Sequence, residues 1–335
     1  MDKIYRIIPM AVMAGLLAAA VSSCYKEDPL TPDNEAPKYT IVDSEDPAQH
    51  YLYEFWQNTG VYILSEYDDV DYMWNVNSTS DYEITRIEPT VLSDAIEYLK
   101  DVLTEMYGAE FAKKYFPFKI LLADQISDSM SYAEDADDMI CGFGRSYIAI
   151  GKLRQDILSA LTDTQKLEYL GKINGILWGN FIYENNLITI PESFFTPSQE
   201  YYGVNLKVRI TNPDTYETTF EDVFGNPFNE EEAIKLAGMW FYSEPPDEYY
   251  AMAPEEAGDV AGFVEMILTH TAEEMQAEME GYDILLIKYN ALISAVKEAC
   301  GIDLQALGDA NVRKFGSLVA GEGAGDDQTE EEGAE

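Results

Sequence analysis

The sequence predicts a mixed α+β domain in which helices predominate after residue 160. Two short apolar runs, residues 116–123 (FPFKILLA) and 146–151 (SYIAIG), have the length and composition of buried strands. Residues 90–107 carry apolar side chains at a helical period. A longer helix is expected to end at Tyr183. With 47% apolar residues in 335, the chain can form one sizeable core.

The remaining elements follow from caps and breakers. Either Thr162 or Thr164 can cap the helix that ends at Tyr183. Cys141 to Gly144 (CGFG) is expected to form a turn, because no helix follows this lone G-x-G. The other expectations are a short helix and a strand over 51–73, an aromatic-rich loop region over 190–230, and helices over 230–239, 260–269 and 272–300, the last broken at Gly281.

The N-terminus resembles a lipoprotein signal peptide, residues 1–23, and is excluded from the fold. Lys3 and Arg6 precede a 15-residue apolar stretch, and Val-Ser-Ser-Cys resembles a lipobox that ends at Cys24. The stretch is too short to span a bilayer comfortably as a helix. An ordinary secretory signal with an incidental cysteine remains the alternative. Lipid on Cys24 is the expected membrane anchor.

Residues 24–48 are expected to form a flexible tether. Lys26, Glu27 and Asp28 resemble the surface-export signal of Bacteroidota lipoproteins, although a generic acidic linker has the same composition. Four prolines among acidic residues favour an extended chain. We therefore expect a protein anchored to the outer membrane and exposed at the cell surface. The domain is expected over 49–320, followed by a solvated acidic tail over 321–335.

Charge and residue counts exclude several functions. A formal charge of −41 rules out general nucleic-acid binding and docking on an anionic membrane through a basic patch. Two histidines in the chain limit His-based catalysis and metal binding. Apart from Cys24, the cysteines are Cys141 and Cys300. We expect them to be two buried free thiols, and a disulfide between them is the alternative.

Three segments resemble a family of zinc metallohydrolase lipoproteins that accompany outer-membrane nutrient import in Bacteroidota. These segments are DPAQHYLYEFWQNTGVYIL, EYLKDVLTEMYGAEFAKKYFPFKILLAD, and ILWGNFIYEN with its IPESF exit. The resemblance covers residues 45–310. It implies a zincin-like fold with a small mixed sheet and a predominantly helical C-terminal half. It also implies, as partners, a TonB-dependent transporter and its substrate-binding lipoprotein.

The family carries His-Glu-x-x-His on the long helix, where the imidazoles bind zinc and the Glu activates water. The resemblance places the first His on Gly179, the Glu on Asn180 and the second His on Tyr183. A further acidic ligand falls near Gly258, in a looser match that can shift by a few residues. Glycine offers no ligand atom, and an amide takes no proton near neutral pH. We therefore expect no zinc and a degenerate metallopeptidase without catalytic residues.

Other chemistries are weakly supported. No G-x-S-x-G or P-loop motif occurs. Paired carboxylates can cleave glycosidic bonds, but such pairs arise by chance among 62 acidic residues and are not evidence for an enzyme. An acid-based hydrolase is therefore kept only as an alternative. Zinc held by unrecognised ligands such as His270, Cys141 and Cys300 is another alternative. His270 is otherwise expected at a helix end. Two acidic clusters lack the spacing of a calcium loop and are expected to be solvated, Glu134–Asp138 and Asp68–Asp71.

Aromatic density is the one positive functional indication. Exposed rings stack on sugars or receive peptide side chains. Gly179 is expected to expose backbone to a vacated cleft, in which a peptide or oligosaccharide would bind. The candidate binding residues are Asn180, Tyr183, Tyr201, Tyr202, Trp240 and Tyr242. We therefore expect a non-catalytic accessory of nutrient import that uses this cleft to bind a peptide or glycan or to dock on the transporter. The alternatives are an active hydrolase and a purely structural subunit.

Overall fold

The structure, a computed structural model, describes residues 38–72, 82–128 and 136–319. From Ile41 onward these residues belong to one unit. The expected signal peptide, Cys24, the Lys26-Glu27-Asp28 motif and the acidic tail lie outside the described residues. Within those ranges no helix is both long and apolar enough to cross a membrane.

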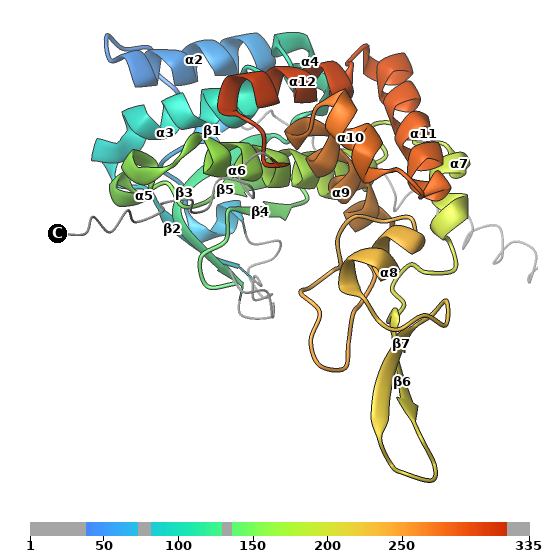
Figure 1. Cartoon of the computed structure of the whole chain (residues 1–335). Coiled ribbons are helices and arrows are strands. Elements are labelled where there is room, and N and C mark those ends of the chain that lie inside the picture. The colour runs from blue at the N-terminus through green and yellow to red at the C-terminus, as the bar shows by residue number, and fades with distance from the viewer. Residues whose placement is uncertain (1–37, 73–81, 129–135, 320–335) are drawn as a thin grey trace, which may run out of the picture. The chain divides into compact units, whose positions relative to one another are not determined.

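A small mixed sheet lies at the N-terminal side of the fold (Figure 1). Its strands run in the order β1–β3–β5–β4, and β2 also pairs with β3. β3 pairs in parallel with β1 and β5, whereas β2 and β4 are antiparallel to their neighbours. The strands are β1 (Tyr62–Leu64), β2 (Tyr82–Arg86), β3 (Lys119–Asp128), β4 (Cys141–Gly144) and β5 (Tyr147–Ile150).

Two of these strands correct the sequence analysis. The expected turn at Cys141–Gly144 is wrong, because these residues form strand β4 on the edge of the sheet. A Cβ at Gly144 would overlap the ring of Tyr147, so a larger residue there would force this buried ring to move. β3 also continues five residues beyond Ala123, the expected end of this strand. The additional residues pair with β2, which the sequence analysis missed.

The expected helices over 90–107 and 163–183 are present, and each ends in a π-helical turn. Thr162 caps the second, where its hydroxyl accepts from the backbone N–H of Gln165. The expected break at Gly281 is confirmed, with φ at 88°. The helices are α2 (Pro47–Thr59), α3 (Leu92–Leu99), α4 (Ala109–Tyr115), α5 (Gln155–Ala160), α6 (Asp163–Ile176), α7 (Glu192–Phe195), α8 (Glu230–Leu236), α9 (Glu256–Thr269), α10 (Ala272–Glu278), α11 (Asp283–Cys300) and α12 (Leu304–Phe315). The π turns are η3 (Lys100–Thr104) after α3 and η4 (Leu177–Tyr183) after α6, and the 3₁₀ turns are η1 (Asp69–Asp71), η2 (Pro89–Val91) and η5 (Thr196–Ser198).

Residues 190–230 are not the loop region that we expected. They hold α7, η5 and an antiparallel hairpin of β6 (Lys207–Thr211) and β7 (Thr218–Asp222). The hairpin extends away from the helices (Figure 1). Its strands are largely exposed, so they lack the alternation of apolar and polar residues that reveals a half-buried strand.

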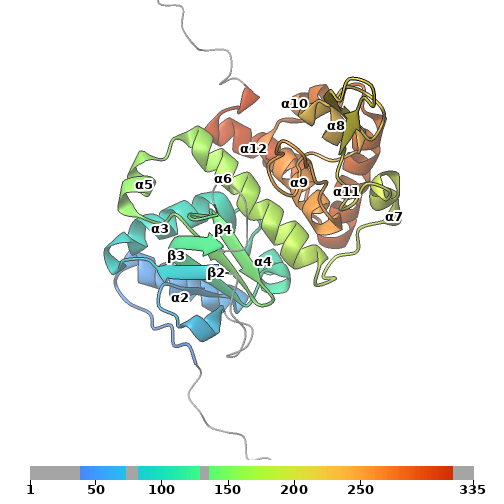
Figure 2. The same ribbon diagram turned by 90° about the horizontal axis from the view of Figure 1, so that it is seen from below.

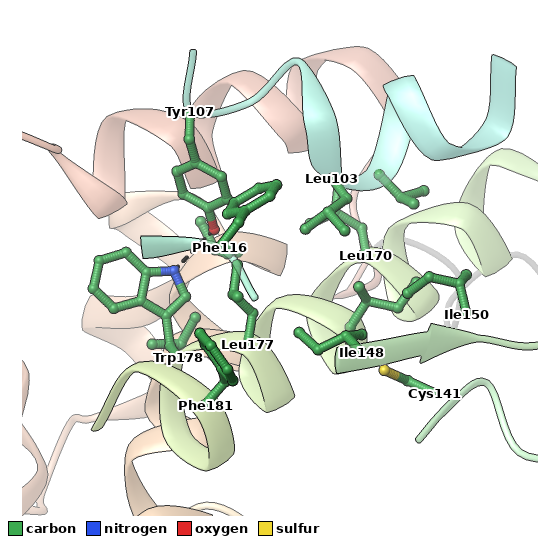
Figure 3. Close-up of a cluster of buried hydrophobic side chains, with 14 of the residues drawn as sticks. Leu103, Tyr107, Phe116, Cys141, Ile148, Ile150, Leu170, Leu177, Trp178 and Phe181 are labelled. Atoms are coloured by element: carbon green, nitrogen blue, oxygen red, sulfur yellow. Dashed lines mark hydrogen bonds between the residues drawn. The ribbon is translucent and has the colours of Figure 1, made fainter. Parts of the chain in front are cut away.

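Helix α6 lies between the sheet and the C-terminal helices (Figure 2). Its buried side contributes to the main core (Figure 3). Trp178 donates its indole N–H to the Tyr107 hydroxyl at 3.0 Å, and Tyr107 donates to Asn174 Oδ1 at 2.8 Å. Because these buried polar atoms are paired, the core fixes the rotation of α6 and η4.

Candidate functional site

Helix α6 and its continuation η4 pack closely on α9 through three glycines four residues apart, Gly171, Gly175 and Gly179. A Cβ at Gly175 would lie 2.9 Å from the Ala261 carbonyl oxygen. A Cβ at Gly179 would overlap the carbonyl oxygen of Ala257. The expectation that Gly179 exposes backbone to a cleft is therefore wrong, because α9 covers this glycine.

Tyr183 lies one turn further along η4 and is held by α9. Its hydroxyl donates to Glu256 Oε2 at 2.5 Å, and its ring lies 5.2 Å from that of Phe195, centroid to centroid. Burial, and then the Glu256 carboxylate, raise the pKa of the Tyr183 phenol. Asn180 is half-buried, and within the described ranges its side chain makes no hydrogen bond.

The residues at these positions do not fit a zinc ion. Gly179 has no ligand atom and no room for one, and the raised pKa of Tyr183 opposes the phenolate that a metal would need. Gly258 likewise lacks a side chain. Within the described ranges, no group of three or more His, Cys, Asp and Glu side chains is arranged to hold a metal ion.

The histidines and cysteines lie apart from this region. His50 in α2 contacts Asp43 at 2.7 Å. His270 ends α9, as expected, and its Nδ1 lies 3.0 Å from the Met266 carbonyl oxygen. Cys141 and Cys300 are free thiols, and burial raises the pKa of both.

A buried ion pair joins α9 to α11 on the side of Tyr202. Lys288 and Asp259 are almost completely buried, and Lys288 Nζ lies 2.5 Å from Asp259 Oδ2. Nζ also donates to Ser198 Oγ at 2.8 Å and to the Gly238 carbonyl oxygen at 2.7 Å. Tyr202 donates to Asp259 Oδ2 at 2.6 Å. Asp259 Oδ1 is buried without a hydrogen-bond partner in the described residues.

This arrangement is structural. Burial lowers the pKa of Lys288 and raises that of Asp259, and each charge opposes the shift of the other. Three acceptors surround Nζ, and only an ammonium has three N–H donors to satisfy them. Although a lysine beside a serine can activate a nucleophile, Ser198 is completely buried, so no substrate reaches its hydroxyl.

A groove of about 890 Å³ lies on another side of α9, which we call the α6–α9 groove. Its walls come from α6, α8, α9 and residues 240–246. The volume is within the range of about 300–1,000 Å³ that is usual for small-molecule sites. The residues that line it include Lys172, Gly175, Lys235, Trp240, Phe241, Tyr242, Pro245, Pro246, Gly258, Ala261, Gly262 and Glu265.

The structure separates the aromatic residues that we expected to share one cleft. Trp240 and Tyr242 line the α6–α9 groove, together with Gly258. Tyr183 and Tyr202 do not line it. The ring centroid of Tyr201 instead lies 5.2 Å from the ring centroid of Phe224, near the base of the hairpin.

The groove contains one acid whose titration is shifted toward neutral pH. Burial raises the pKa of Glu265 to about 7, while the Lys172 ammonium opposes the shift and the Glu168 carboxylate adds to it. Neither Glu265 nor Lys288 was among the residues predicted from the sequence. Each is a lone charge in an apolar helical run, VAGFVEMIL and ILLIKYNAL, and this pattern could have indicated them.

Comparisons with known proteins support the fold. The chain is similar to a solved structure from Bacteroides caccae that is described as a candidate zinc-binding metallo-peptidase, with a TM-score of 0.51 and 13% sequence identity. The match covers 83% of this chain and 96% of the other. No family model and no curated protein matches the chain. The expected fold is thus confirmed, an α+β metallopeptidase-like domain with a small mixed sheet and many helices.

Proposed function

We propose that this chain is a non-catalytic accessory lipoprotein of an outer-membrane nutrient importer, and that it binds its ligand in the α6–α9 groove. The lipobox-like Val-Ser-Ser-Cys sequence supports anchoring through lipid on Cys24, and Lys26-Glu27-Asp28 supports exposure at the cell surface. The partners would be a TonB-dependent transporter and its substrate-binding lipoprotein.

One observation carries the non-catalytic part of the proposal. The helix that resembles the zinc-binding helix of this fold has Gly179 pressed against α9 and Tyr183 hydrogen-bonded to Glu256. Neither position offers a ligand in the form that zinc requires. The fold is retained while the motif positions in the described part of the chain hold no zinc ligand, which favours binding over hydrolysis.

Zinc content tests this part directly. Mature protein, purified without an affinity tag and analysed by elemental mass spectrometry, should hold well under one zinc per chain. Chelator should leave its melting temperature unchanged. The triple variant Gly179→His, Asn180→Glu and Tyr183→His should not gain hydrolysis, because an imidazole at position 179 would collide with α9. Stoichiometric zinc with chelator-sensitive hydrolysis would instead favour the alternative, an active hydrolase.

Association with the importer requires a separate measurement. Cross-linking of intact cells, followed by purification of the chain, should recover a TonB-dependent transporter. A matched sample of the Cys24→Ala variant should recover much less, since it would not be held at the membrane. Equal recovery of the transporter from both samples would contradict anchoring as the basis of this association.

A further inference from the structure

Two polar groups of the α6–α9 groove have no hydrogen-bond partner in the described part of the chain. The indole N–H of Trp240 is a donor buried without an acceptor. The Glu265 carboxyl lines the groove without a hydrogen bond to another side chain or to backbone. Lys172 lies close enough to lower the pKa of Glu265 and adds a second donor. The Trp240 N–H is too deeply buried for a ligand in the groove to reach, but a ligand that both donates and accepts hydrogen bonds would satisfy Glu265 and Lys172.

The same groove offers an aromatic surface beside these groups. Phe241 is 41% exposed and lies over the backbone of α9 at Gly262, where a Cβ would be 3.1 Å from ring atom Cδ2. Pro245 and Pro246 continue this wall and restrict its backbone. A flat, partly exposed ring can stack on the C–H face of a sugar ring and leave its hydroxyls free to form hydrogen bonds.

The lining argues against other ligand classes. None of the lining residues belongs to a strand of the described structure, so an extended peptide could not add itself to a sheet edge there. A polyanion would meet Glu230, Glu231 and Glu244 at the groove. Lys235 does not offset them, since it is already paired with Glu231 at 2.7 Å and with Glu278 at 2.8 Å.

We infer that the α6–α9 groove binds an uncharged oligosaccharide, with one sugar ring stacked on Phe241 and its hydroxyls bonded to Glu265 and Lys172. This inference rests on the proposed function, because it names the ligand class for the same groove. The near-neutral pKa of Glu265 agrees with it, since a carboxyl that is partly protonated can both donate to and accept from hydroxyls.

The test is an array of uncharged, uronic-acid and amino-sugar oligosaccharides together with peptides of similar size, probed with the whole mature chain. Uncharged oligosaccharides should give the signal. Calorimetry with the best of them should show binding weakened about tenfold or more by Phe241→Ala and by Glu265→Ala, through lost stacking and lost hydrogen bonding. Tyr216→Ala is the control, since Tyr216 is 81% exposed in the hairpin turn outside the groove, and it should bind like the wild type.

Circular dichroism and melting temperature would establish that both groove variants fold. Signal from peptides alone, or from charged sugars alone, would overturn the inference and leave the proposed accessory role standing. Uncharged sugar binding that survives both groove substitutions would overturn it too, as would the absence of any sugar signal. Zinc-dependent hydrolysis, measured separately, is the result that would instead remove the proposed function.

Discussion

Replacing Lys288 by methionine should destabilise the domain strongly. The substitution keeps the length and apolar stem of the side chain but removes the ammonium. Three hydrogen bonds would be lost, to Asp259, Ser198 and the Gly238 carbonyl oxygen. Asp259 would then remain buried with the Tyr202 hydroxyl as its donor, while Oδ1 is already without one.

The magnitude follows from this unpaired carboxylate. Breaking a buried pair by removing one partner costs about 3–5 kcal/mol, because an uncompensated charge stays in the interior. Burial already raises the pKa of Asp259, and the loss of Lys288 should raise it further. A carboxyl whose pKa is higher in the folded than in the unfolded state loses stability as pH rises through the folded pKa. The variant should therefore be more destabilised at pH 8 than at pH 5.

Urea denaturation, followed by circular dichroism, measures these free energies of unfolding. The double variant Lys288→Met with Asp259→Leu removes both charges and should recover at least about 2 kcal/mol relative to the sum of the two single losses. Lys297→Met is the matched control on the same helix, because its pair with Asp303 at 2.9 Å is exposed and should contribute less than about 1 kcal/mol.

Two results would refute the reasoning. The first is a decrease in the free energy of unfolding of less than about 1 kcal/mol for Lys288→Met at pH 7, which would mean that the buried ion pair contributes little to stability. The second is strict additivity of the two substitutions, because coupled charges in contact should not behave independently.

Three further predictions concern other parts of the chain. Gly179→Ala should lower the free energy of unfolding in urea by about 1–3 kcal/mol, since the new Cβ meets the backbone of α9. Gly262→Ala should cost less, because the exposed Phe241 ring can move. Equal losses for the two variants would contradict the close contact at Gly179. Glu265→Gln should match the wild type in stability near pH 5 and exceed it by about 1–2 kcal/mol near pH 8. The reason is that the pKa of Glu265, raised to about 7, makes the wild type lose stability between those pH values. A constant difference in stability across this range would show that the pKa of Glu265 is not raised. Cys24→Ala should move the protein from the membrane to the soluble fraction on cell fractionation, and quantitative recovery with outer membrane would contradict lipid anchoring.

Local signals made much of the secondary structure predictable. The helix that ends at Tyr183 was foreseen with a threonine cap at Thr162 or Thr164, and Thr162 forms that cap. The strand at 146–151 followed from a short apolar run, and the helix break at Gly281 from a residue that adopts positive φ easily. Elements without such signals were missed, among them the exposed hairpin and edge strand β4, whose pairing partner decides its conformation.

The candidate site was predictable only in part. Trp240 and Tyr242, which the sequence indicated as candidate binding residues, line the α6–α9 groove, as does Gly258, which was expected as a vestigial metal-site position. The direction in which Gly179 faces was not predictable, because it depends on α9, which begins 77 residues later in the chain. Glu265 and Lys172 were not connected by the sequence analysis, since their proximity requires two packed helices.

The sequence by itself determined what the residues at the zinc-motif positions could not do. A glycine and an amide at the positions that resemble a zinc motif exclude those side chains as ligand and general base, whatever the fold. Only the tertiary structure decided where the open space lies. Helix packing closes the face at Gly179 and leaves the α6–α9 groove beside it, and it brings Lys288 onto Asp259 across 29 residues. Such contacts depend on how helices pack against each other, and composition and local spacing do not specify that packing.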